Sequence, residues 1–141
     1  MSAGRVIVGV DGSEASQRAL RWAADYAVAM DAHLEAVAVW EMPATYGWIT
    51  STQDVSPTDT ALKGLEAIVT EVVGSEPHVE LTVSRGHAAH VLVEASKRAT
   101  LLVVGSRGMG GVRGMLLGSV SQHCVQHAEC PVVVFRGAKH W

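Results

Sequence analysis

Residues 101–119 read LLVVGSRGMGGVRGMLLGS, and this stretch decides the fold. It opens with LLVVG, an uninterrupted apolar run that is typical of a strand buried on both faces. Residues 105–119 then contain six of the chain's 14 glycines. Because glycine loses more backbone entropy on folding than other residues, this concentration indicates either a tight turn or a ligand that lies against bare backbone.

Short apolar runs alternate with helix-period segments along the rest of the chain. Strands are expected at residues 5–10, 33–40, 79–84, 101–105 and 132–135; helices are expected at 13–30, 58–73 and 87–99, with a last one marked by Val120, Cys124 and Ala128. Strands separated by helices form parallel βαβ units with right-handed crossovers. The sequence therefore predicts one doubly wound, Rossmann-like α/β domain over residues 1–141, with a five-stranded parallel sheet and helices on both faces.

Two segments carry more specific expectations. In the first helix Ser13 is the expected N-cap, and the apolar positions with helical spacing are Ala19, Ala23, Ala27 and Met30. Residues 41–57 have turn formers and large apolar side chains but no sustained period, which indicates a long loop or a lid that carries Trp48. Trp40, just before this segment, either flanks a ligand or packs in the core.

Composition excludes several classes of function. The formal net charge is −3, and the 11 Lys and Arg residues are scattered, whereas nucleic-acid binding needs clustered cations. Two cysteines are too few for a disulfide framework. No basic and apolar leader opens the sequence, and no apolar run approaches the roughly 20 residues that span a bilayer. We expect a cytoplasmic protein with no nucleic-acid or membrane partner.

The glycine-rich stretch lies where this fold binds ligands, beyond the carboxyl ends of the strands. If the first and fourth strands are neighbours, Asp11 in the turn VDGS faces the glycines that follow LLVV. A helix that begins near GSV, residues 118–120, offers unpaired N–H groups and partial positive charge to a phosphate, while the Asp11 carboxylate suits ribose hydroxyls. The combination favours a nucleotide, and a methyl at Gly105 or Gly118 would crowd its phosphates.

Two common nucleotide signatures do not occur, and a third does. The chain has no GxxxxGK[ST], and GxGxxG fails at Arg113. Gly105, Gly108, Gly118 and Ser119 instead match G-x2-G-x9-G-[ST], with VGVDGSEAS near the start and CPVVVFR near the end. In these motifs the chain resembles the nucleotide-binding branch of the universal stress protein family, over residues 5–136. One departure is Thr100, where the family often has an acidic residue.

The resemblance implies a strand order of 3-2-1-4-5 and a bound ATP, alone or with Mg²⁺. It places the Asp11 carboxylate on the ribose, the backbone of Gly9 and Val10 along the pocket, and the backbone of Val39 on the adenine. The residues implied for the phosphates are Gly105, Ser106, Arg107, Gly108, Met109, Gly110, Gly111, Gly118, Ser119 and Val120.

An uncharged strand at Val132–Phe135 would form an exposed edge of the sheet if it is last in order, and such edges invite pairing. The family resemblance implies a homodimer joined at this edge. The alternative is an edge covered by the C-terminal tail GAKHW.

Catalysis is not expected, and no catalytic residue is assigned. Residues 105–119 contain no acidic residue and no histidine, and the chain has neither GxSxG nor HExxH. We expect an ATP-binding regulatory protein of the stress response without efficient turnover. The alternatives are a slow Mg²⁺-dependent ATPase or phosphotransferase that uses Asp11, a cAMP-binding module, and a dimeric fold without nucleotide.

The segment HCVQHAEC raises the question of a metal. His123 and His127 are four residues apart on one helical face and Cys130 follows, yet structural zinc needs four ligands. His87 and His90 would contribute only if their helix packed nearby, so we expect a solvated or partly buried histidine pair and no metal. Cys124 is expected in the core and Cys130 at a helix end.

Overall fold

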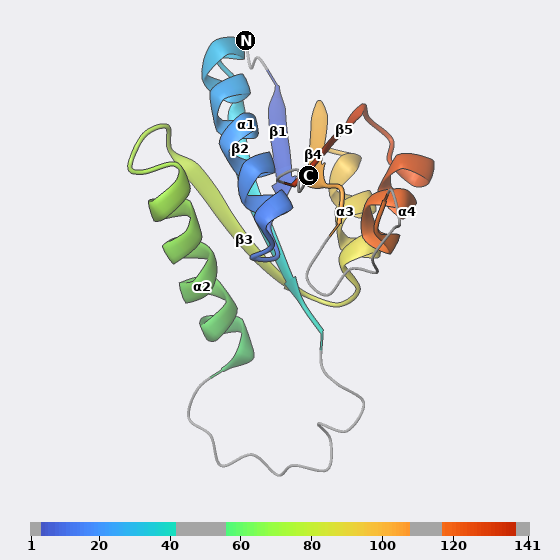
Figure 1. Cartoon of the computed structure of the whole chain (residues 1–141), viewed down its shortest axis with the longest axis horizontal. Helices are drawn as coiled ribbons and strands as arrows, with labels where there is room; N and C mark the ends of the chain where they lie inside the picture. The colour runs from blue at the N-terminus through green and yellow to red at the C-terminus, as the bar shows by residue number, and fades with distance from the viewer. Residues whose placement is uncertain (1–3, 42–55, 108–116, 138–141) are drawn as a thin grey trace, which may run out of the picture.

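The computed structural model describes residues 4–41, 56–107 and 117–137. The strands are β1 (Arg5–Gly9), β2 (His33–Trp40), β3 (Val79–Arg85), β4 (Leu101–Gly105) and β5 (Val132–Phe135). The helices are α1 (Glu14–Met30), α2 (Pro57–Val72), α3 (Ala88–Ser96) and α4 (Ser119–His127). All strands pair in parallel in the order β3-β2-β1-β4-β5, which confirms the predicted fold and strand order (Figure 1).

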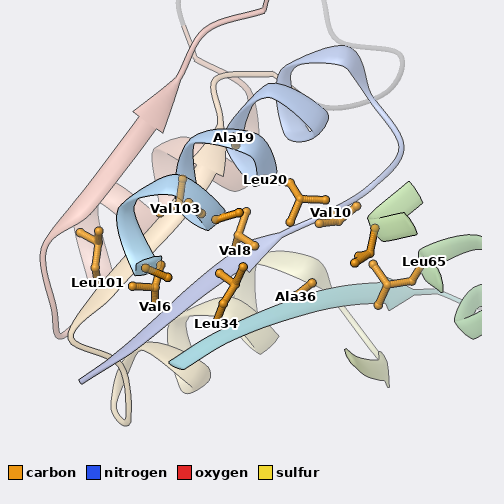
Figure 2. Close-up of a cluster of buried hydrophobic side chains, with 14 residues drawn as sticks. Val6, Val8, Val10, Ala19, Leu20, Leu34, Ala36, Leu65, Leu101 and Val103 are labelled. Atoms are coloured by element: carbon orange, nitrogen blue, oxygen red, sulfur yellow. The ribbon is translucent and has the colours of Figure 1, made fainter. Parts of the chain in front are cut away.

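Helices cover both faces of the sheet, as the sequence predicted (Figure 1). Alternate side chains of each central strand point to opposite faces. Val6, Val8 and Val10 pack with α1 and α2, in the core that Figure 2 shows. Ile7 packs on the other face, with Leu92 of α3 and Cys124 of α4. Two apolar layers therefore hold α1 and α2 on one face of the sheet and α3 and α4 on the other.

Helix α1 begins and ends for local reasons. The Ser13 side chain accepts a hydrogen bond from the Ser16 N–H at 3.2 Å, which confirms Ser13 as the N-cap. Its buried face includes Ala19, Ala23 and Ala27. Placing Met30 with this stripe was wrong, because Met30 is 52% exposed. It is the last residue of the helix, and the chain reverses at once through Asp31, in the left-handed conformation at φ 53°.

Helix α2 begins earlier than predicted. Pro57 is its first residue, and Ser56 is the N-cap, whose side chain accepts from the Thr58 N–H at 3.2 Å. Proline suits the first helical position, because the N–H that it lacks would have no partner there. Residues 42–55 of the predicted lid, Trp48 among them, lie outside the described residues.

Cysteine positions agree with the sequence prediction. Cys124 is fully buried in the core between α4 and the sheet, and this burial raises the pKa of its thiol to about 11. Cys130 follows the end of α4 and is partly buried; burial raises the pKa of this thiol too. Both thiols therefore stay protonated and unreactive near neutral pH.

A buried carboxylate inside the sheet was not predicted. Glu35 of β2 is 1% exposed and binds the guanidinium groups of Arg98 and Arg5. The Thr82 hydroxyl also donates to it, at 2.7 Å. Burial alone raises the pKa of Glu35, but the hydrogen bonds from Arg98 and Thr82 and the charges of Arg98 and Arg5 lower it below its usual value. The carboxylate is thus held ionised and links β2 to β3 and to the segment after α3.

Among the helices that the structure describes, none combines the length and the apolar character needed to cross a bilayer.

Candidate functional site

The order of the strands reverses between β1 and β4: β2 and β3 are added on one side of β1, and β4 and β5 on the other. These strands are neighbours, with Val6 paired to Leu101 and Val8 to Val103. β1 leads into α1 on one face, whereas α4 packs on the other face. The structure thereby brings residues 9–11 and 105–107 together at the carboxyl edge of the sheet. We call residues 9–11, 39, 105–107 and 118–120 the rim site; such a switch point is where doubly wound sheets bind ligands.

Val39 presents main-chain groups to this switch point. β1 ends at Gly9, which pairs with Val37, but β2 continues to Trp40. The Val10 N–H donates to the Val37 carbonyl at 2.8 Å, so the main-chain groups of Val37 face β1. Because these groups alternate in direction along a strand, those of Val39 face the same way, where β1 has already ended. One N–H donor and one carbonyl acceptor at this position suit the edge of a purine.

Asp11 builds the turn at the end of β1. Its Oδ1 accepts a hydrogen bond from the Ser13 N–H at 2.9 Å, and its own N–H donates to the Ser16 hydroxyl at 3.3 Å. Gly12 between them has φ +87°, a conformation that side chains disfavour. The Asp11 residue remains exposed. The structure therefore shows the turn-forming role of Asp11 and places this exposed residue at the rim.

Helix packing leaves little space for a side chain at two rim glycines, and at Gly105 the obstacle is backbone. A Cβ on Gly9 would lie 3.0 Å from Leu92 Cδ1 of α3. A Cβ on Gly105 would lie 2.9 Å from the Ala15 carbonyl carbon and the Ser16 nitrogen of α1, closer than real Cβ atoms come. A methyl at Gly105 therefore meets the backbone of α1 whether or not a phosphate is present.

Two of the main-chain amides predicted for phosphate are used inside the protein. The Ser106 N–H donates to the Phe135 carbonyl at 2.7 Å, and the Gly118 N–H donates to the Ser106 carbonyl at 2.6 Å. The buried Ser121 hydroxyl donates to that same carbonyl at 2.8 Å. These bonds fasten the start of α4 to the end of β4; sequence reasoning missed Ser121, since nothing in its spacing marks it.

The first turn of α4 supplies the donors that remain. Gly118 caps the helix in an extended conformation and has no side chain that could cap it. Within the described residues, the N–H groups of Ser119 and Val120 have no hydrogen-bond acceptor. Ser119 is exposed. Together with the partial positive charge of a helix N-terminus, these two N–H groups can donate hydrogen bonds to an anion.

The other residues predicted for the phosphates are described only in part. Arg107 is exposed at the end of β4. Gly108, Met109, Gly110 and Gly111 lie outside the described residues. Trp40 is half-buried and makes one hydrogen bond and one cation–π contact: its Nε1–H donates to the Thr58 hydroxyl at 3.1 Å, and the Arg85 guanidinium lies 5.7 Å from its ring centre.

Thr100, the departure from the family pattern, has a structural partner. Its hydroxyl accepts from the Arg5 N–H and donates to the Arg5 carbonyl, both at 2.8 Å. The side chain thus joins the start of β4 to the start of β1, at the opposite end of the sheet from the rim site.

Comparisons with known proteins agree with this architecture. A sequence model described as the universal stress protein family matches residues 3–136. Universal stress protein Rv2623 of Mycobacterium tuberculosis is 39% identical over 139 residues, which cover 92% of this chain and 46% of that protein. The chain therefore spans about half the length of that relative.

Solved structures show the same fold. A universal stress protein in complex with cAMP is 26% identical, with a TM-score of 0.69, and the match covers 98% of this chain and 100% of that one. The universal stress protein from Archaeoglobus fulgidus in complex with dAMP is 23% identical, with a TM-score of 0.59, over 93% of this chain and 96% of that one. At that identity the second likeness shows the fold alone.

Proposed function

The chain belongs to the universal stress protein family, and we propose that it is an ATP-binding regulatory member that responds to the nucleotide without turning it over efficiently. The observation that carries the proposal is the rim site. There the edge of β2 at Val39, beyond the end of β1, and the Ser119 and Val120 amides, which have no acceptor among the described residues, lie at the same switch point as the exposed residue Asp11.

Each part of the nucleotide has a chemically suited partner. Adenine meets the N–H and carbonyl of Val39, and the ribose hydroxyls donate to Asp11. The phosphates lie on the first turn of α4, where the available amides and the helix dipole favour negative charge. The solved relative in complex with cAMP supports an adenine nucleotide in a fold of this kind.

A triphosphate is favoured over cAMP by the sequence around this helix. The spacing of Gly105, Gly108, Gly118 and Ser119 is the pattern of the nucleotide-binding branch of the universal stress protein family. Resemblance to that branch implies ATP as the ligand. A cyclic monophosphate is the second candidate, and the complex with cAMP is the observation that favours it.

The chemistry at the rim site supports ATP binding without efficient hydrolysis. Phosphoryl transfer needs a positioned nucleophile and carboxylates that hold Mg²⁺. Asp11 already accepts a hydrogen bond from the Ser13 N–H. Among the described residues, no group of three or more His, Cys, Asp or Glu side chains is arranged to hold a metal ion. These features support binding and regulation in preference to catalysis.

Thermal unfolding with ATP, ADP, AMP and cAMP, each with and without Mg²⁺, tests the proposal. A ligand at 100 times its Kd adds about 2.7 kcal/mol of stability. We expect the largest shift with ATP, and a smaller one in Asp11→Asn, which keeps the oxygen that accepts from Ser13. A larger shift with cAMP would favour the second candidate, and no shift with any nucleotide would contradict both.

Phosphate release at an enzyme-like rate, abolished in Asp11→Asn, would instead establish the ATPase alternative.

We also propose that two copies pair at β5. The strand order places Val132–Phe135 at one edge of the sheet, and the strand carries no charged residue. An edge strand without charged residues is suited to pairing with another copy. Of the tail GAKHW, residues 137–141 and the alternative cover for this edge, only Gly137 is among the described residues.

A further inference from the structure

Four histidines form a continuous row across the packed helices α3 and α4. The ring centres of His87 and His90 are 5.9 Å apart, those of His90 and His123 are 5.6 Å apart, and those of His123 and His127 are 4.4 Å apart. His87 and His90 belong to the start of α3, whereas His123 and His127 belong to α4. The contact between the helices is thus what joins two separate pairs into one row.

We propose that His123 and His127 bind a divalent transition-metal ion, of which Zn²⁺ is the representative, with His90 as the ligand from the neighbouring helix. Histidines four residues apart lie on one face of a helix and can hold one metal ion between them. Imidazole nitrogen is a preferred ligand of zinc, copper and nickel. The site is separate from the rim site and does not depend on nucleotide binding.

The pair on α4 provides the fixed part of the site. His123 is half-buried and His127 is exposed, so both rings are held on the helix surface at a position that solvent reaches. Within the described residues, no three metal-ligating side chains already converge on one point. The exposed side chain of His90 must therefore rotate toward the ion, while water or an external ligand completes the coordination.

His87, at the end of the row, is placed differently. Its Nδ1 lies 3.0 Å from Oε1 of Glu41, the residue that follows β2. This contact gives His87 an acidic partner, and in the row His90 lies between its ring and that of His123. His87 is therefore assigned no coordinating role, which makes it a matched control within the same row.

The consequence of metal binding is a bridge between the two helices. Coordination by His90 and the α4 pair would hold α3 against α4, and a ligand that binds only the folded chain raises its stability. Mg²⁺ prefers oxygen ligands and should not bind to imidazoles. A titration with Mg²⁺ therefore distinguishes the histidine site from a site for nucleotide-bound Mg²⁺.

Titration calorimetry with ZnCl₂ on the chelator-treated full chain, without nucleotide, tests the proposal. We expect one ion per chain, a rise in the unfolding temperature, and no binding of MgCl₂. His123→Gln and His127→Gln should each weaken zinc binding by at least about tenfold, since loss of even a residue that supports a metal ligand costs about 10–100-fold. His90→Gln should weaken it less, because the pair on α4 remains.

The controls are His87→Gln, in the row, and His78→Gln, outside the row. His78 directly precedes Val79, the first residue of β3. Both should bind zinc like the original chain. Circular dichroism and unfolding in chelator establish that each variant folds. Zinc binding that survives in both α4 variants, or that is lost equally in His87→Gln, would overturn the assignment, as would no zinc binding by the original chain. Cu²⁺, which broadens the NMR signals of nearby residues, should affect α3 and α4 first; broadening centred elsewhere would also contradict the site.

Discussion

At the scale of single residues, the rim site is built from groups that also hold the fold together. Gly105 is required by the backbone of α1, and the Asp11 carboxylate shapes the turn before that helix. Substitutions at such positions alter stability and binding together. Gly105→Ala is therefore a poor probe of the phosphate contacts, since the clash with Ala15 and Ser16 remains in the protein without nucleotide.

The buried carboxylate of Glu35 gives a prediction on stability and pH. Glu35→Gln should lower the free energy of unfolding at neutral pH by about 1.5–3 kcal/mol, the usual value of hydrogen bonds to a charged group. Glu80→Gln, which removes the exposed partner of the same Arg5, should cost no more than about 1 kcal/mol. Urea denaturation of both variants measures the difference, and equal losses would contradict the account.

The sign of the pH dependence follows from the direction of the pKa shift. Since the pKa of Glu35 is lower in the folded chain than its ordinary value of 4.5, its contribution is complete above that value. It is lost as the pH falls through the folded pKa. Unfolding measured between pH 6 and pH 3 should show a shallower loss of stability in Glu35→Gln than in the original chain.

At the scale of elements, Ser121 controls the position of α4. Its hydroxyl and the Gly118 N–H both bind the Ser106 carbonyl. Ser121→Ala should lower stability by about 1 kcal/mol and weaken ATP binding, because the Gly118 N–H alone then holds the first turn of α4 to the Ser106 carbonyl.

Ser96→Ala is the matched control for this prediction. Ser96 is equally buried, on α3, and its hydroxyl accepts from the Glu129 N–H at 2.9 Å. Calorimetry with ATP should show a similar loss of stability in the two variants but weaker ATP binding only in Ser121→Ala. The same affinity in both would indicate that the start of α4 does not hold the phosphates.

The elements themselves could be predicted from local signals. Hydrophobic periodicity and the Ser13 cap locate α1, and alternating apolar runs locate the strands. The partners of individual polar groups could not be predicted, because they depend on which distant residues meet. Glu35 looks like an exposed position of a strand until Arg98 is placed beside it. The Gly118 N–H looks available until the Ser106 carbonyl is found 2.6 Å away.

At the scale of the whole molecule, β5 is the last strand at one edge of the sheet. The Phe135 carbonyl faces β4, where it accepts from Ser106, so by alternation the N–H of Val134 faces outward. Proline lacks this N–H and is tolerated at the outer side of an edge strand. Val134→Pro should therefore remain folded but fail to pair with a second copy.

Light scattering coupled to size-exclusion chromatography measures this prediction. The original chain and Val134→Thr, which keeps the N–H, should have twice the mass of one chain, and Val134→Pro the mass of one. A single-chain mass for the original protein would contradict the proposed dimer. A dimer that persists in Val134→Pro would move the interface to another surface.

The claim on which the account depends is that main-chain amides at the start of α4 bind the phosphates of ATP. Ser119→Pro removes one of those N–H groups, and Gly118 before it already has the extended conformation, φ −74° and ψ 168°, that a following proline requires. Ala88→Pro makes the same change at the first position of α3, after His87 at φ −86° and ψ 126°.

The most direct measurement is the Kd of ATP for these two variants and the original chain by titration calorimetry. We predict a loss of affinity of about tenfold to a hundredfold in Ser119→Pro, the equivalent of one hydrogen bond to a charged group, and no loss in Ala88→Pro. Unchanged ATP affinity in a folded Ser119→Pro protein would contradict it.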